Sequence, residues 1–201
     1  MSLIRKLRSK PWETPGFPGP DTDGGVLLPD KKVGLWVFIV VMASVFGLFT
    51  VAYNMRIELA TDWIAIPKPP VLWLNTAILV LASVAFERAK AAVHKKLTGD
   101  VKLWLVVGGA FTIGFLLGQY IAWQQLLASG YALSDNPANA FFYLITGMHG
   151  LHLIGGLWVW SRTMLRVWQG FEVTLSVELC TTYWHALLLI WIVLFGLLLS
   201  T

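Results

Sequence analysis

The stretch Ala140-Phe-Phe-Tyr-Leu-Ile-Thr-Gly-Met-His-Gly-Leu-His-Leu-Ile-Gly-Gly156 determines how this chain must fold. It lies in a run from Asn136 to Ser161 that contains no Asp, Glu, Lys or Arg. A helix crosses a bilayer with about 20 apolar residues, so the run is long enough to span one. His149 and His152 are therefore predicted at membrane depth and on one helix face, because residues three apart are neighbours. An intramembrane polar side chain is costly, so each histidine should bond to another helix or serve a function.

Four further apolar runs accompany this one, three before it and one after it. The chain of 201 residues is 57% hydrophobic and 13% charged, which is more apolar surface than a soluble domain of this size can bury. Each run should be an α-helix, since the bilayer core offers no water to the backbone, and its continuity excludes β-barrel strands. We therefore predict an all-α, polytopic membrane protein with five transmembrane helices, at about residues 33–54, 70–93, 102–127, 137–165 and 175–201.

The first 32 residues have a different character from the rest. A basic cluster between Arg5 and Lys10 is followed by the proline-rich segment Pro11 to Pro20. No apolar core follows the basic cluster, so the segment is not a secretory signal. We predict an irregular cytoplasmic tail at residues 1–32 and a single five-helix domain at residues 33–201.

The basic residues predict the orientation of the helices in the membrane. Thirteen Lys and Arg residues lie in the tail and in the two connections expected on its side, against only Arg56 and Lys68 on the other side. By the positive-inside rule, the N-terminus should be cytoplasmic and the C-terminus outside, in the periplasm of a bacterial cell. This distribution fits membrane topology rather than nucleic-acid binding, so no nucleic-acid partner is expected.

The polar groups within the spans are the candidate functional residues. Besides the two histidines, they include Asn75, Gln119, Glu178, Tyr183 and His185. Three interpretations of the histidines are open: ligation of a metal or haem by His149 or His152 with His185, a structural or lipid-contacting role in the helix bundle, and proton handling by Glu178 with a histidine. A di-iron enzyme would need more histidines and carboxylates than this chain offers. The sequence has no phosphate loop, Cys-x-x-Cys or nucleophile–base motif.

The phrases around these residues resemble subunit III of the haem–copper terminal oxidases, in its short five-helix bacterial form. The similarity is closest in Phe141 to His152 and in Tyr183-Trp184-His185, which Glu178 precedes. It continues in order through all five predicted spans, from about Val33 to the C-terminus, and includes Gly34 to Phe38, Leu72 to Thr76 and Gln119.

The resemblance implies an accessory, cofactor-free subunit in the bacterial inner membrane that is not catalytic by itself. Haem and copper would lie in its partners, subunits I and II, in a complex that reduces oxygen and pumps protons. The helices would form two groups separated by a cleft that binds phospholipids, and the chain would stabilise the catalytic subunit through repeated turnover. No residue would be catalytic or bind a metal, and the polar groups would contact lipid, a subunit or one another: Asn75, Gln119, His149, His152, Glu178, Tyr183, Trp184 and His185.

Three acidic positions of that family are apolar here, namely Met42, Ala122 and Leu188. The change at Met42 argues against proton collection through the first span and leaves the lipid and stabilising roles untouched. Two alternatives to the oxidase subunit are an accessory subunit of a nitric oxide reductase system and a small membrane haem or metal protein that uses His149, His152 and His185.

Overall fold

The structure is a computed structural model that describes residues 30–59, 69–131 and 136–200. The predicted tail at residues 1–32 lies almost wholly outside this part of the chain. The described residues form five α-helices and no strand: α2 (Asp30–Leu59), α3 (Val71–His94), α4 (Thr98–Ala128), α5 (Pro137–Trp168) and α6 (Thr174–Leu199). All five are long and apolar enough to cross a membrane. The predicted all-α class with five membrane-spanning helices is therefore confirmed.

The helix ends depend on polar residues beside the apolar runs. The side chain of Asn136 accepts a hydrogen bond of 3.0 Å from the backbone N–H of Ala138, and Pro137 occupies the first turn. Both residues favour a helix start, since the first N–H groups of a helix lack partners and proline supplies none. Asp100 in the first turn of α4 complements the positive end of the helix dipole. Because their terminal turns include polar residues, several helices are longer than their apolar runs.

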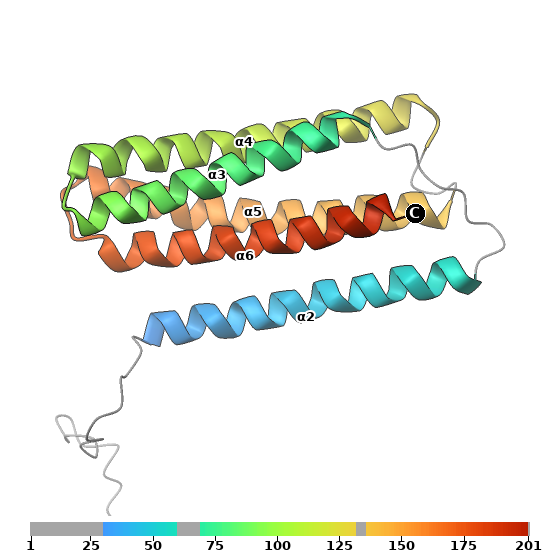
Figure 1. The fold of residues 1–201 in the computed structure, drawn as a ribbon, viewed down its shortest axis with the longest axis horizontal. Helices are drawn as coiled ribbons and strands as arrows, with labels where there is room; N and C mark the ends of the chain where they lie inside the picture. Colours follow the sequence, from blue (N-terminus) through green and yellow to red (C-terminus); the bar gives the residue numbers. More distant parts are fainter. Residues whose placement is uncertain (1–29, 60–68, 132–135, 201) are drawn as a thin grey trace, which may run out of the picture. The chain divides into compact units, whose positions relative to one another are not determined.

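Helices α3 to α6 form a closed group in which neighbours run antiparallel (Figure 1). α3 packs on α4 and α6, and α5 packs on the same two helices. The turns between α3 and α4 and between α5 and α6 lie at one end of the bundle, where α2 also begins. Successive helices therefore run in opposite directions, as successive membrane spans must.

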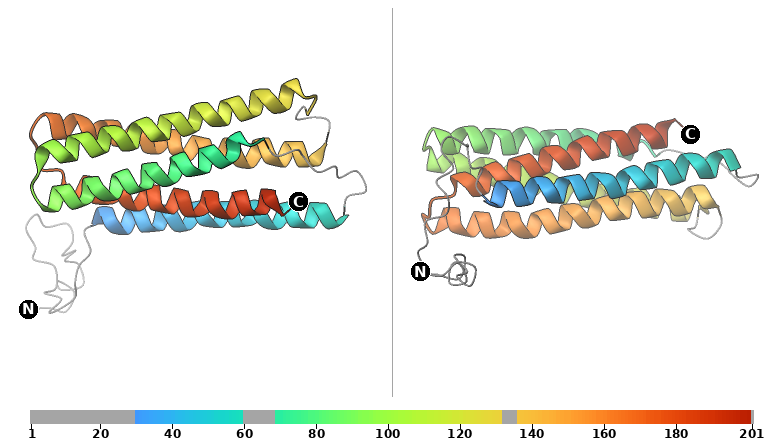
Figure 2. Two further views of the ribbon diagram at one scale, coloured as in Figure 1. Left: turned by 45° about the horizontal axis from the view of Figure 1, so that its top comes forward. Right: turned by 90° about the horizontal axis from the view of Figure 1, so that it is seen from below.

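Helix α2 lies beside α5 and α6 (Figure 2). It contacts them through aromatic side chains. The ring of Phe46 lies 5.4 Å from that of His152, and Tyr53 lies 5.6 Å from Phe141 in an edge-on contact. The backbone of α2 stays farther from its neighbours than the backbones of the other four helices stay from one another. Packing around α2 is therefore looser than packing within the group of four.

Indole groups link the four closely packed helices. Trp184 of α6 donates 2.8 Å to the hydroxyl of Thr112 on α4, and Trp191 donates 3.0 Å to Thr76 on α3. Trp123 and Trp160 make equivalent bonds between α4 and α5, to the Thr146 hydroxyl and the Leu105 carbonyl. Each bond satisfies a buried N–H that lipid could not satisfy. These side chains set the depth at which each helix meets its neighbour.

Candidate functional site

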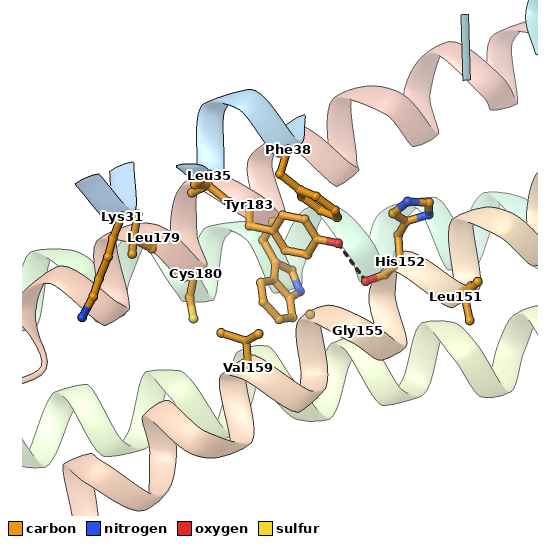
Figure 3. Close-up of a pocket in the computed structure, with 12 residues that line it drawn as sticks. Lys31, Leu35, Phe38, Leu151, His152, Gly155, Val159, Leu179, Cys180 and Tyr183 are labelled. Carbon is orange, nitrogen blue, oxygen red and sulfur yellow. Dashed lines mark hydrogen bonds between the residues drawn. The ribbon is translucent and has the colours of Figure 1, made fainter. Parts of the chain in front are cut away.

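A cavity of about 450 Å³ lies between α2, α5 and α6. Its volume is in the range of ligand pockets, which is about 300–1,000 Å³. Figure 3 shows Lys31 at one end and His152 with Leu151 at the other, and the wall between them is mainly apolar. The remaining lining residues are Leu35, Phe38, Gly155, Gly156, Val159, Leu179, Cys180, Tyr183 and Trp184. The cavity therefore combines an apolar body with a cationic end.

Three predicted site residues, His152, Tyr183 and Trp184, line this cavity. The Tyr183 hydroxyl donates 2.9 Å to the backbone carbonyl of His152, which ties α6 to α5 (Figure 3). The Nδ1 atom of His152 lies 2.8 Å from the carbonyl of Met148 in its own helix. Phe38 of α2 lies against both rings, with centroids 6.4 Å from His152 and 6.1 Å from Tyr183. Three of the residues predicted from the sequence thus line one cavity.

Glu178 lies at the entrance to the bundle, one turn into α6, and is half-buried. Its carboxylate lies 2.7 Å from the Nζ of Lys32 on α2 and 3.3 Å from the Nε2 of His94 on α3. Glu178 is a site residue predicted from the sequence, whereas Lys32 and His94 are not. The pair with Lys32 is an ionic link between α2 and α6.

His185 lies on the outer surface where α3 meets α6. Its Nδ1 bonds the hydroxyl of Ser83, and its Nε2 lies 3.2 Å from the carboxylate of Glu87. Lys90 lies 3.3 Å from the other oxygen of Glu87. Serine, histidine and carboxylate stand in the order of a hydrolase triad, an arrangement that no sequence motif indicated. Ser83 is only 4% exposed, however, so a substrate carbonyl has no path to its hydroxyl.

Asn75, Gln119 and Trp184 lie inside the bundle, where Trp184 is also part of the cavity wall. Asn75 and Gln119 face each other between α3 and α4, with 3.4 Å from the amide nitrogen of Asn75 to the oxygen of Gln119. A methyl group at Gly118 would overlap Asn75, so the glycine makes room for this pair. Trp184 is 1% exposed, and its ring lies 4.2 Å from that of Phe86 at an interplanar angle of 34°, besides its bond to α4. These three residues hold helices together.

His149 is fully buried in an aromatic shell. Trp191, Phe115 and Phe46 lie around it, with ring centroids 5.1, 5.8 and 6.2 Å away. Neither ring nitrogen has a hydrogen-bond partner among the described residues. A buried polar group without a partner costs about 1–3 kcal/mol. Among the predicted site residues, His149 is therefore the one whose side chain makes no hydrogen bond within the described residues.

The three membrane histidines do not converge on a common point. His149 lies in the core, His152 faces the cavity, and His185 lies on the outer surface bonded to Ser83 and Glu87. Within residues 30–59, 69–131 and 136–200, no group of three or more His, Cys, Asp and Glu side chains is placed to hold a metal ion. The pairing of His149 or His152 with His185 around a haem has no support in this arrangement.

Three residues that complete these contacts were missed by sequence reasoning: Lys32, Glu87 and His94. Lys32 and His94 were counted only as basic residues near span ends. Ser83, in contrast, is one of the polar residues of the second span that are expected to form hydrogen bonds between helices. The available signal for the missed residues was their register. In an antiparallel pair of helices, residues near the end of α3 must meet residues near the start of α6, and Glu178 and His185 needed partners there.

Comparison with known proteins agrees with this architecture. The family described as Cytochrome c oxidase subunit III matches residues 30–199, which include all five helices. A cytochrome c oxidase subunit 3 from Thermostichus vulcanus is 30% identical over 184 residues, which cover 85% of this chain and 87% of that protein.

Two further relatives carry the same subunit number. A probable cytochrome c oxidase subunit 3 from Mycobacterium tuberculosis is 28% identical over 160 residues, 74% of this chain and 76% of the relative. A cytochrome bo(3) ubiquinol oxidase subunit 3 from Pseudomonas aeruginosa is 28% identical over 173 residues, with 81% and 80% covered. Together with the five helices, these matches indicate a multi-pass membrane protein that works with other oxidase subunits. The chain therefore belongs to the cytochrome c oxidase subunit III family, the accessory subunits of haem–copper terminal oxidases.

Proposed function

We propose that this chain packs against subunit I of a bacterial haem–copper oxidase, near subunit II, and stabilises the catalytic subunit through repeated turnover. The observation that carries the proposal is the family match over residues 30–199, because it covers every described helix rather than one motif. The haem and copper would lie in the partner subunits. The buried side chains of this chain bond helix to helix, which suits a rigid packing unit.

The proposed location is the bacterial inner membrane, with the N-terminus in the cytoplasm. The basic turns at Lys95, Lys96 and Arg166 lie at the same end of the bundle as the start of α2. That end carries most of the thirteen basic residues counted in the sequence, so the positive-inside rule assigns it to the cytoplasm.

The proposed ligand is a phospholipid, with an acyl chain in the cavity between α2, α5 and α6. Apolar walls suit the acyl chain, and each methylene buried there contributes about 0.8 kcal/mol. The ammonium of Lys31 at the cytoplasmic end suits the phosphate of the headgroup. Tyr183 and His152 would contact the far end of the chain. The loose packing of α2 leaves room for such a lipid to act as a spacer.

Affinity purification of this chain from its own membranes tests the main proposal. The preparation should contain a haem–copper catalytic subunit and give its reduced-minus-oxidised spectrum, whereas the chain purified alone should show no Soret band. Membranes that lack the chain should start at a normal rate of oxygen consumption and lose activity faster during turnover. Stoichiometric haem on the isolated chain, or a preparation with no oxidase partner, would contradict the proposal.

A substitution that fills the cavity tests the lipid site. A Cβ at Gly155 would meet no heavy atom of the described structure within 4 Å, and Gly155 lines the cavity. Gly155→Leu should therefore fill the cavity and lower the phospholipid retained per complex. Gly47→Leu is the matched control, since Gly47 is equally open but is not a lining residue. Equal lipid content in both variants would count against this cavity as the lipid site.

A further inference from the structure

The outer surface where α3 meets α6 carries an exposed ionisable side chain at a depth where the neighbouring helices present aliphatic residues. We define the α3/α6 seam as Glu87 and Lys90 of α3 with Thr182, His185 and Leu189 of α6. We propose that the α3/α6 seam is the surface that docks a transmembrane helix of the catalytic subunit, and that this helix presents a hydrogen-bond donor to Glu87. The identity of the partner rests on the proposed function, whereas the choice of this face rests on the contacts below.

His185 is the deepest exposed ionisable group of the seam. It lies eleven residues after the start of α6 at Thr174, which corresponds to about 16 Å along the helix axis. Its side chain is 45% exposed, and that of Glu87 is 51% exposed. Lipid headgroups lie at the helix ends, so at this depth an exposed imidazole would meet acyl chains. Such residues in transmembrane helices normally face a protein or a water-filled space.

The contacts inside the seam leave an acceptor for a partner. Both ring nitrogens of His185 are engaged, one by Ser83 and the other by Glu87. Lys90 bonds the second oxygen of the Glu87 carboxylate at 3.3 Å. A carboxylate accepts about four hydrogen bonds, and these two partners use only part of that capacity. Lys90 already balances the charge of Glu87, so the missing partner is a neutral or weakly basic donor rather than a second strong cation.

The other outward faces offer no such group at this depth. In the ranges that the structure describes, His185 is the one exposed ionisable residue more than ten positions from both ends of its helix. The outer faces of the neighbouring helices present aliphatic side chains instead, such as Leu117 on α4 and Ile154 on α5. Arg162 of α5 lies six residues from its helix end and stacks at 4.0 Å on Trp158. Lipid can cover those faces, whereas the seam needs a polar partner.

Photo-crosslinking in the assembled complex tests which face docks. Leu189 lies one turn beyond His185 on the same face and is 65% exposed. A benzoylphenylalanine at position 189 should crosslink to the catalytic subunit, and the same probe at Leu117 or Ile154 should crosslink much less. A chain that co-purifies with the oxidase but crosslinks only from 117 or 154 would overturn the seam assignment and leave the proposed function intact. A chain that never co-purifies would instead overturn the proposed function.

Two variants at Glu87 test the chemistry of the contact. Glu87→Leu should lower the fraction of oxidase that retains this chain after a detergent wash by about tenfold, the equivalent of one or two hydrogen bonds. Glu87→Gln should retain most of the association, since its amide oxygen still accepts. Glu172→Leu removes an exposed acid from the α5–α6 turn and serves as the matched control. Helix content and yield in detergent verify folding of each variant. Retention of Glu87→Leu at the level of the control would overturn the proposal.

Discussion

At the scale of single residues, His149 is a polar side chain that is buried among aromatic rings. It is fully buried among Phe46, Phe115 and Trp191, and its ring nitrogens have no partner within the described ranges. Met42 lies one turn before Phe46 on α2, on the same helix face, and is 2% exposed in the same core. We predict that an acidic residue at position 42 would reach the imidazole of His149, which has no hydrogen-bond partner among the described residues.

A double-mutant cycle between these two positions tests this interpretation. His149→Leu alone should leave the thermal stability of the chain unchanged or raise it, because it removes an unsatisfied polar group. Met42→Glu should destabilise strongly in the His149→Leu background and less beside His149. The coupling free energy should be about 1–3 kcal/mol, as for a hydrogen bond to a charged group. Thermal unfolding in detergent measures all four proteins, and additive changes would contradict the contact.

The sequence shows which polar side chains lie within a membrane span more reliably than it shows the residues they bond to. Polarity within an apolar run is visible in one dimension, so Asn75, Gln119, Glu178 and His185 could be named in advance. Their partners depend on helix register. Glu178 meets Lys32 and His94, each on a different helix, and His185 meets Ser83 and Glu87. Such pairings follow from three-dimensional packing that no local pattern encodes.

At the scale of the helices, small residues in α4 decide how closely its neighbours approach. A Cβ at Gly108 would press against Phe86 of α3, and one at Gly109 would overlap the indole of Trp160 on α5. Trp160 is held by its bond to the Leu105 carbonyl one turn earlier in α4. Close approach through glycine is the usual route to tight packing in membranes, where lipid removes most of the hydrophobic drive.

A glycine pair in α4 therefore provides a matched test of this packing. Gly109→Ala should destabilise the chain by about 1–3 kcal/mol, because the Trp160 ring cannot move without losing its bond. Gly114→Ala should be neutral or slightly stabilising, since its Cβ would lie 3.9 Å from Ile78, an ordinary contact, and alanine favours helix. Unfolding midpoints in detergent compare the two. Equal effects would show that helix propensity, not packing against Trp160, determines the outcome.

The helices themselves could be predicted because hydropathy and length suffice for an intramembrane helix. The ends of the helices and the contacts between them depend on more than hydropathy and length. The Asn136 cap and Pro137 fix the start of α5 by local chemistry, whereas the extension of α2 to Leu59 includes Arg56 and Glu58 beyond the apolar run. The indole bonds of Trp184 and Trp191 connect helices far apart in sequence, so composition alone could not distinguish them from tryptophans at span ends.

At the scale of the whole bundle, the ion pairs of Glu178 and the cavity beside the loosely packed helix α2 lie toward the same end of the bundle axis. The Lys32–Glu178–His94 contacts lie at the end where the α3–α4 and α5–α6 turns meet, and the cavity beside α2 opens near Lys31 at that end. A phospholipid in this cavity and the ionic link of α2 to α6 would therefore act together in the same leaflet. The resemblance predicts a lipid cleft, and the cavity between α2, α5 and α6 is the proposed site for it.

The orientation of this axis can be tested with two cysteines at opposite ends. Ser129 ends α4 and Gln169 ends α5, and both are exposed. With the N-terminus in the cytoplasm, α4 runs outward and α5 runs inward, so Ser129→Cys should react with an impermeant maleimide in intact cells and Gln169→Cys only after permeabilisation. Cys180 is buried, so the parent chain provides a low background. The reverse pattern would place the thirteen basic residues outside, against the positive-inside rule, and would move Lys31 and the headgroup it is proposed to bind to the outer leaflet.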